Sequence, residues 1–145
     1  MLDCCDPWNG TQIIQALPKY SLNYDDITDL IITHGHSDHW GNLSLFQQAK
    51  IYMGDDMAKD GIYETLDDFV QIRPIPGHTD HDRSIIVAEY GTVDIVGDIF
   101  EENDDSWKEN SKYPEEQEKS RKIILNEADW IIPGHGRMFK NKLNM

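Results

Sequence analysis

Histidine and aspartate side chains gather in one stretch of this 145-residue sequence, residues 33–42 (THGHSDHWGN). Three of the six histidines fall within six consecutive positions of it. Imidazole nitrogens and carboxylate oxygens are the ligands that zinc and similar ions take in proteins. A polar loop with histidines placed by chance is the alternative interpretation, and it suits a single histidine better than three together. The stretch therefore predicts a metal site.

The elements on either side of this stretch indicate how it presents its ligands. An apolar run, residues 30–32, precedes it, and a short helical pattern over residues 43–46 follows it. Side chains two apart on an extended chain point the same way, so we expect His34 and His36 to bind one ion together. Two further candidate ligands lie where the chain turns into the helix and face a neighbouring point: Asp38 and His39.

Three later motifs place a histidine or an aspartate after an apolar run: residues 76–79 (PGHT), 96–98 (VGD) and 133–136 (PGHG). In this order, and after the first stretch, they resemble the signature of the metallo-β-lactamase superfamily. The resemblance implies an α+β fold, the αββα sandwich of that family, with residues 1–145 as one domain. It also implies a site along one sheet edge.

The resemblance assigns the metal ligands position by position and implies two Zn²⁺ ions per chain. The ligands of the first ion are His34, His36 and His78, those of the second are Asp38, His39 and His135, and Asp98 bridges both. All seven positions carry the expected residue type, which favours an enzyme over a relative that has lost its ligands. Iron or manganese would also suit these oxygen and nitrogen ligands.

Two adjacent divalent ions predict a hydrolase. A water that bridges them has its pKa lowered from ~15.7 toward ~7, so hydroxide is available at neutral pH. Asp38 is the predicted catalytic residue, since its carboxylate could orient this hydroxide and accept its proton. The sequence shows no Ser-His-Asp or Cys-His arrangement that would supply a covalent nucleophile.

A narrower resemblance covers nearly the whole chain. Its motifs are residues 6–8 (DPW), 33–46, 97–101 (GDIFE), 105–107 (DSW), 117–122 (QEKSRK) and the turn at 133–136. They are similar to those of a subgroup of the superfamily linked to the 3′ processing of histone pre-mRNA. The resemblance implies an endoribonuclease that hydrolyses phosphodiester bonds of single-stranded RNA.

Two other functions stay open. One is a thioester hydrolase that resembles glyoxalase II and acts on a small thioester substrate, although the chain ends ten residues after His135 and so lacks the helical substrate domain of that enzyme. The other is a metal-binding protein without turnover.

The charge of the chain weighs against RNA. The formal net charge is −14, and nine acidic residues between Asp98 and Glu118 stand against only Lys108 and Lys112. An acidic surface repels nucleic acid and anionic membrane at long range. The basic residues nearest the predicted ligands in sequence are scattered: Arg73, Arg83 and Arg137. We expect slow, weakly salt-dependent RNA cleavage if RNA is the substrate.

The first residues and the cysteines suggest a location and an assembly. In the superfamily, the aspartate at the position of Asp3 supports the metal site and is usually followed by Thr-Gly, whereas Cys4 and Cys5 stand here. Adjacent cysteines close only a strained ring, so we expect free thiols, a reducing compartment and a cytoplasmic or nuclear protein. No apolar run reaches the length of a membrane span.

Met1 falls almost on the strand that ends at Asp3, whereas domains of the superfamily open with further strands. We therefore expect a sandwich that lacks its first N-terminal strands. Missing strands would expose unpaired backbone and apolar surface, which predicts a homodimer of lower stability than an N-terminally extended chain.

The remaining elements follow from hydrophobic patterns and turn residues. We predict a helix from residues 9–11 to Pro18 with Ile13, Ile14 and Leu17 on one face, strands at 28–33, 50–53, 69–75 and 130–132, a hairpin of 84–90 and 92–96 around Gly91, and a helix over 114–128. Residues 54–68 are predicted to form a polar loop, and His81 is predicted to be an exposed loop histidine.

Overall fold

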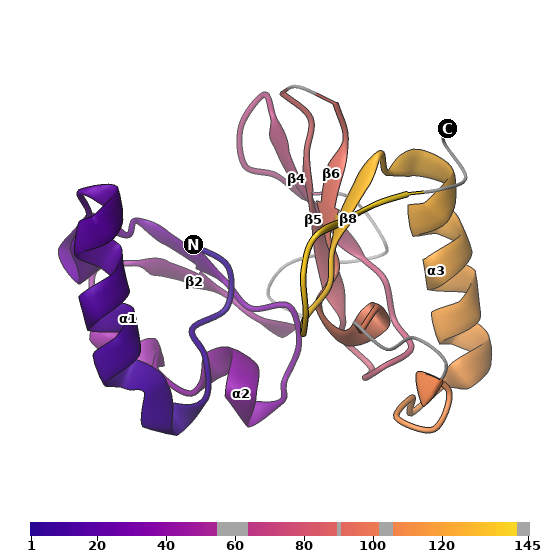
Figure 1. Cartoon of the computed structure of the whole chain (residues 1–145), viewed down its shortest axis with the longest axis horizontal. Coiled ribbons are helices and arrows are strands. Elements are labelled where there is room, and N and C mark those ends of the chain that lie inside the picture. The colour runs from indigo at the N-terminus through magenta and orange to yellow at the C-terminus, as the bar shows by residue number, and fades with distance from the viewer. Residues whose placement is uncertain (55–63, 90, 102–105, 142–145) are drawn as a thin grey trace. The chain divides into compact units, whose positions relative to one another are not determined.

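The computed structural model describes residues 1–54, 64–89, 91–101 and 106–141. The chain divides into two compact units, unit 1 (Met1–Asp56) and unit 2 (Met57–Met145). Each unit is described by itself below, and Figure 1 colours the chain from indigo at the N-terminus to yellow at the C-terminus. The expectation that residues 1–145 form one domain remains a prediction.

Unit 1 is built on two parallel strands, β1 (Asp29–Ile31) and β2 (Lys50–Tyr52). Parallel neighbours need a crossover connection, and here it contains α2 (Ser37–Trp40) and η4 (Leu43–Leu45). The start of the chain runs beside β1, where the Asp3 amide donates to the Ile31 carbonyl at 2.9 Å. Both predicted strands of this unit are confirmed, and so is the strand-like course of the first residues.

The core of unit 1 lies between this sheet and the N-terminal helices η1 (Pro7–Asn9), α1 (Gly10–Ala16) and η2 (Leu17–Tyr20). Its buried members are Cys4, Ile13, Ile27, Leu30, Ile32 and Phe46. The predicted helix ends as expected, because Pro18 cannot continue the α-helical hydrogen bonds and the chain tightens into η2. Ile14, predicted to share the buried face, is exposed instead. A further turn, η3 (Tyr24–Asp26), leads toward β1.

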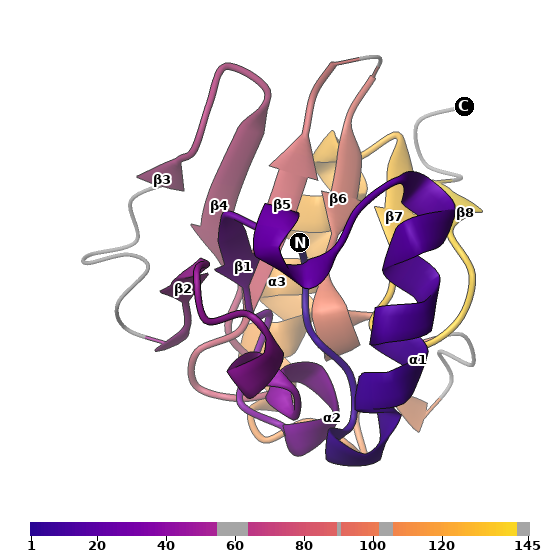
Figure 2. The ribbon, with the colours of Figure 1, turned by 90° about the vertical axis from the view of Figure 1, so that its left-hand side faces the viewer.

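Unit 2 contains a six-stranded sheet in which chain order and spatial order agree (Figure 2). Its strands are β3 (Glu64–Thr65), β4 (Val70–Pro74), β5 (Arg83–Val87), β6 (Val93–Ile95), β7 (Trp130–Ile132) and β8 (Phe139–Lys140). All neighbours are antiparallel except β6 and β7. The predicted hairpin is confirmed as β5 and β6, with Gly91 at a φ of 105° in the connection and Tyr90 outside the described residues.

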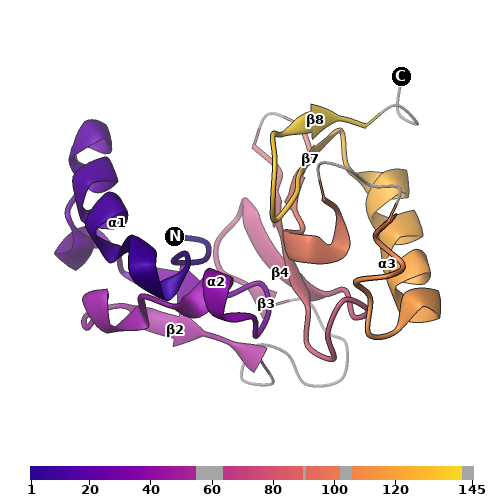
Figure 3. The ribbon, with the colours of Figure 1, turned by 60° about the horizontal axis from the view of Figure 1, so that its bottom comes forward.

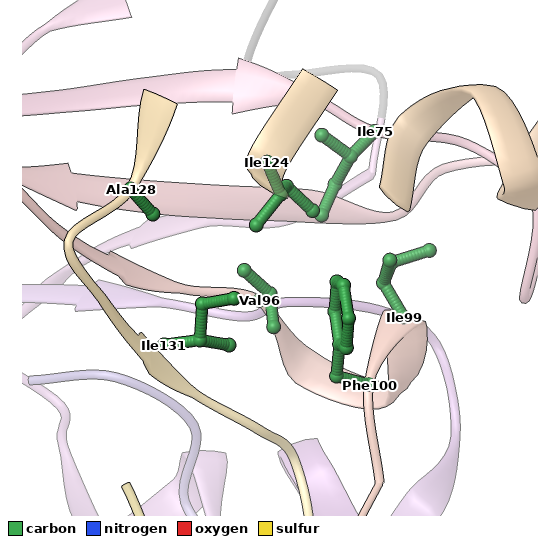
Figure 4. Packing of buried hydrophobic residues seen from close by; sticks show 7 residues of the cluster. All are labelled: Ile75, Val96, Ile99, Phe100, Ile124, Ala128 and Ile131. Atoms are coloured by element: carbon green, nitrogen blue, oxygen red, sulfur yellow. The ribbon is translucent and has the colours of Figure 1, made fainter. Parts of the chain in front are cut away.

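The parallel pair of unit 2 is joined through α3 (Pro114–Glu127), which confirms the predicted helix. Figure 3 shows α3 running along the sheet. Its inner face packs on a buried apolar cluster, drawn in Figure 4, made of Ile75, Val96, Ile99, Phe100, Ile124, Ala128 and Ile131. Each fully buried large side chain of such a cluster contributes about 1.5–3 kcal/mol.

Two strands of unit 2 differ from the predictions. Residues 55–63 of the predicted loop lie outside the described part of the chain, but the loop prediction is wrong at Glu64–Thr65, which form β3 and pair with β4. The sequence also gave no indication of β8, which pairs with β7. A two-residue strand is too short to show an alternating pattern.

Within the described residues, no helix has both the length and the apolar character that a membrane crossing requires.

The turn after Asp3 has an unusual backbone. Cys5 has a φ of 58°, in the left-handed region that residues with a side chain rarely adopt. Asn42 holds the turn in place, because its side-chain amide donates to the carbonyls of Cys4 at 2.7 Å and Asp6 at 2.8 Å. The superfamily usually has a glycine at the position of Cys5, which has no such steric cost.

We predict that Cys5→Gly stabilises the protein, because glycine removes about 1 kcal/mol of left-handed strain, partly offset by its greater freedom in the unfolded chain. Thermal unfolding should show a melting temperature higher by roughly 1–3 °C. Cys5→Ser is the matched control, since it removes the thiol but keeps the Cβ atom. A rise of equal size in both variants would show that the thiol, and not the backbone, is responsible.

Candidate metal centre

The clustered ligands of unit 1 follow the end of β1. His36 is extended, at φ −79° and ψ 143°, and precedes α2, which carries Asp38 in its first turn and His39 near its end. His34 Nε2 and His36 Nδ1 lie 3.0 Å apart, so the prediction that these two side chains point the same way is confirmed. His34 and His39 are buried, whereas His36 is exposed.

Asp3 fixes the orientation of His39. Its Oδ2 atom accepts a hydrogen bond from His39 Nδ1 at 2.7 Å, and its two oxygens also accept from the amide and the hydroxyl of Thr33 at 2.7 and 2.8 Å. An imidazole that donates through Nδ1 keeps the lone pair of Nε2 for a metal. His39 Nε2 lies 3.7 Å from Asp38 Oδ2. The contact between Asp3 and His39 agrees with the supporting role that the resemblance implied, and that role stays a prediction.

The two cysteines beside Asp3 do not offer thiolates. Burial raises the pKa of the Cys4 thiol to about 11. Partial loss of solvent, together with the negative charges of Asp3 and Asp6, raises the pKa of the Cys5 thiol. Both thiols are free and protonated at neutral pH, whereas a metal binds the thiolate. Cys4 is buried, whereas Cys5 is exposed.

The predicted ligands of unit 2 converge on one oxygen atom. His78 follows β4, Asp98 lies in η6 (Gly97–Ile99) directly after β6, and His135 follows β7. Asp98 Oδ2 lies 3.5 Å from His78 Nε2 and 3.6 Å from His135 Nε2. The order of strand and then ligand, predicted from the sequence, thus brings these three side chains together.

The distances within each unit suit a divalent metal. A tetrahedral zinc with bonds of about 2.0–2.1 Å holds any two of its ligand atoms roughly 3.3 Å apart. The separations of 3.0, 3.5 and 3.6 Å between the paired donor atoms are close to that value. The donors are nitrogen and oxygen atoms of histidine and aspartate, the types that zinc, iron and manganese accept.

The position of Asp98 depends on two glycines whose backbones lie close to it. A Cβ atom on Gly134 would lie 1.9 Å from Asp98 Oδ1, and the Gly134 amide donates to the Gly97 carbonyl at 2.7 Å. Gly97 itself has a φ of 51°. The turn that carries His135 can therefore pack this closely against Asp98 only because residues 97 and 134 are both glycine.

The turn that carries His78 is held by Asp82, which the sequence analysis did not single out. This buried carboxylate accepts hydrogen bonds from the Gly77 and Thr79 amides at 3.0 and 2.7 Å and from the Thr79 hydroxyl at 2.8 Å. Burial raises its pKa, and the bonds from Thr79 oppose the rise. His81 is exposed, as predicted. An aspartate in a polar insertion gives no signal that it is buried.

Two of the three arginines near the ligands in sequence are buried. Arg73 bonds Asp94, Glu127 and Ser84 Oγ, and Arg83 donates to the Asp82 carbonyl at 3.0 Å. Burial raises the pKa of Asp94, and the charge of Arg73 opposes this. Neither guanidinium lies on the surface where a phosphate could meet it, whereas Arg137 is exposed.

The family model of the metallo-beta-lactamase superfamily matches residues 2–54. A relative that covers nearly the whole chain is 40% identical over 156 residues, with 97% of this chain and 67% of the relative covered. Taken with the donor set of each unit, these matches show that the chain belongs to the metallo-beta-lactamase superfamily, a family of metallo-hydrolases.

That relative is metallo-beta-lactamase domain-containing protein 1 of Xenopus laevis. The human protein of the same name is 36% identical over 156 residues, with 97% of this chain and 59% of the human chain covered. The similarity of the whole chain to this subgroup of the superfamily is thereby confirmed, whereas the RNA-processing activity linked to the subgroup stays a prediction. The chain spans about three fifths to two thirds of the length of these relatives.

A solved structure shows the same fold. A metallo-beta-lactamase from Pseudomonas aeruginosa in its mono-zinc form superposes with a TM-score of 0.76 at 20% identity, over 97% of this chain and 73% of that one. The predicted fold class is therefore confirmed. The expectation that the first strands are missing stays an expectation.

We predict that Gly134→Ala lowers the zinc affinity of the protein by about tenfold or more, because the new methyl group must displace the Asp98 carboxylate. Chelator competition on the folded protein measures this. Gly35→Ala is the matched control, since it also lies beside predicted ligands but its Cβ would meet nothing within 4 Å. Equal affinities in the two variants would contradict the placement of Asp98.

Proposed function

We propose that the chain is a zinc-dependent hydrolase that cleaves phosphodiester bonds of single-stranded RNA. The observation that carries the hydrolase is the convergence of two imidazoles on Asp98 Oδ2, together with the paired imidazoles of His34 and His36. Both are donor arrangements for a cation. Membership of the superfamily supports a metal-binding role for the complete set of predicted ligands.

The proposal gives each ligand the position that the superfamily implies. Two zinc ions would be held by His34, His36 and His78, by Asp38, His39 and His135, and by Asp98 as the shared ligand. When bound, divalent metal supplies Lewis acidity, which polarises the substrate oxygen that gains charge and makes a nearby water acidic enough to lose its proton at neutral pH.

The residues of the chain orient the reacting groups and accept the proton. Asp38 is the proton acceptor in this proposal, and its side chain is 38% exposed, so water reaches it. Asp3 keeps the His39 imidazole in the tautomer that leaves Nε2 available. Asp82 keeps the His78 turn in one conformation before substrate arrives.

RNA as the substrate rests on the resemblance of residues 97–101 and 117–122 to the endoribonuclease subgroup. The net charge of −14 and the burial of Arg73 and Arg83 favour a second candidate, a small thioester substrate. A homodimer and a cytoplasmic or nuclear location belong to the same proposal. The two free thiols support a reducing compartment.

Metal analysis tests the zinc centre. We predict more than one equivalent of zinc per chain, and a loss in Asp98→Ala, because the shared ligand serves both ions. His81→Ala is the matched control and should keep the wild-type content, since this exposed histidine is not among the ligands. A content near zero in the wild type after incubation with zinc would end the proposal. Equal contents in both variants would contradict the role of Asp98.

Activity measurements decide between the substrates. Zinc-loaded protein should cleave single-stranded RNA slowly, with weak binding and a shallow dependence on salt, because the chain has 13 basic residues against 27 acidic ones and Arg73 and Arg83 are buried. Chelator and Asp38→Asn should abolish the cleavage. Thioester hydrolysis of S-lactoylglutathione without chelator-sensitive RNA cleavage would favour the second candidate. A steep salt dependence would contradict the argument from charge.

A further inference from the structure

Two side chains of α3 hold the backbone at Asp98. Gln117, which is fully buried, donates through Nε2 to the carbonyl oxygens of Asp98 and Ile99, both at 3.2 Å. Arg121, one helical turn further on, donates through Nη1 to the Ile99 carbonyl at 2.6 Å. These are the carbonyl of the predicted shared ligand and that of the residue after it.

Aromatic rings fix the guanidinium of Arg121. Its central carbon lies 3.9 Å from the ring centroid of Phe100 and 4.6 Å from that of Trp107. Such cation–π contacts favour a charge held over a ring face. Arg121 is also buried, so its side chain has little freedom to leave the Ile99 carbonyl.

The two residues directly before α3 hold the turn that carries His78. The amides of Tyr113 and Lys112 donate to the carbonyls of Gly77 and His78 at 2.8 and 3.2 Å. A Cβ atom on Gly77 would lie 2.3 Å from the backbone of Gln117, so this turn rests directly on the helix. The helix α3 and the two residues before it thus contact the backbone of two predicted metal ligands.

We propose that Gln117 and Arg121 are positioning residues of the metal centre. They hold the main chain at Asp98 so that its carboxylate faces the imidazoles of unit 2 before metal binds. The proposal rests on the proposed function, because it takes Asp98 as a metal ligand. It goes beyond that function by assigning part of the zinc affinity to side chains that do not touch the metal.

The physical reason is preorganisation. A ligand loop that is already in place loses no conformational freedom when metal binds, whereas a loosened loop must be ordered at that moment. Groups that orient metal ligands typically change metal affinity by about 10–100-fold when removed. A side chain that only fills the core would change stability without changing the affinity of the folded state.

Gln117→Met tests this, because methionine has a similar length but cannot donate to the two carbonyls. The matched control is Ile124→Val, a change at a fully buried position of the same helix that lies in the apolar cluster. Zinc affinity is measured by chelator competition on the full chain, and thermal unfolding is recorded for the metal-free proteins. We expect both variants to melt earlier, but only Gln117→Met to bind zinc at least about tenfold more weakly.

A second pair of variants covers the case that Gln117→Met does not fold. Arg121→Met removes the donor to the Ile99 carbonyl and should lose about tenfold in zinc affinity. Arg121→Lys keeps a charge but not the planar group that stacks on the two rings, so its affinity should fall between those of Arg121→Met and the wild type. Wild-type affinity in both Gln117→Met and Arg121→Met overturns this inference and leaves the proposed function standing. An equal loss in Ile124→Val also overturns it. A wild-type protein that binds no zinc overturns both.

Discussion

The arrangement of unit 2 depends on one electrostatic constraint, which is that two imidazole nitrogens approach the same carboxylate oxygen, Asp98 Oδ2. Burying a carboxylate removes water from it. Its approach to two imidazoles is then favourable only if a bound cation, or protons on the imidazoles, compensates for the lost solvation. The surroundings of Asp98 are built to keep this geometry. The backbone of Gly134 packs closely against Oδ1 of this carboxylate, and the side chain of Gln117 donates a hydrogen bond to the main-chain carbonyl of Asp98.

Unit 1 uses a different means to prepare its ligands. Four of the seven predicted ligands come from six consecutive residues, so the local chain geometry of an extended segment and one helical turn brings them together. The carboxylate of Asp3 supplies what local geometry does not, since it fixes the ring of His39 through a single short contact of 2.7 Å. The strained turn after Asp3 is held by Asn42, the last residue of the stretch 33–42.

The main strands and α3, and the grouping of candidate ligands within each unit, could be predicted because each is marked by an apolar run, a turn residue or a dense cluster of metal-binding side chains. The two-residue strands β3 and β8 could not, since they exist through pairing with distant strands. The structural roles of three polar residues could not be predicted for a related reason: Asp82, Gln117 and Arg121. Their partners are mainly backbone groups and rings that only the folded chain brings near, and a polar residue in a polar stretch reads as solvated.

The ligands of the two units differ in how far apart they lie along the chain, and this affects how the metal centre is gained and lost. Those of unit 2 stretch from residue 78 to residue 135, and α3 must dock before the turn of His78 and the main chain at Asp98 are held. Contacts of such long sequence separation form late in folding and are costly to close. Partial unfolding that releases α3 is therefore expected to loosen the His78 turn and Asp98 together.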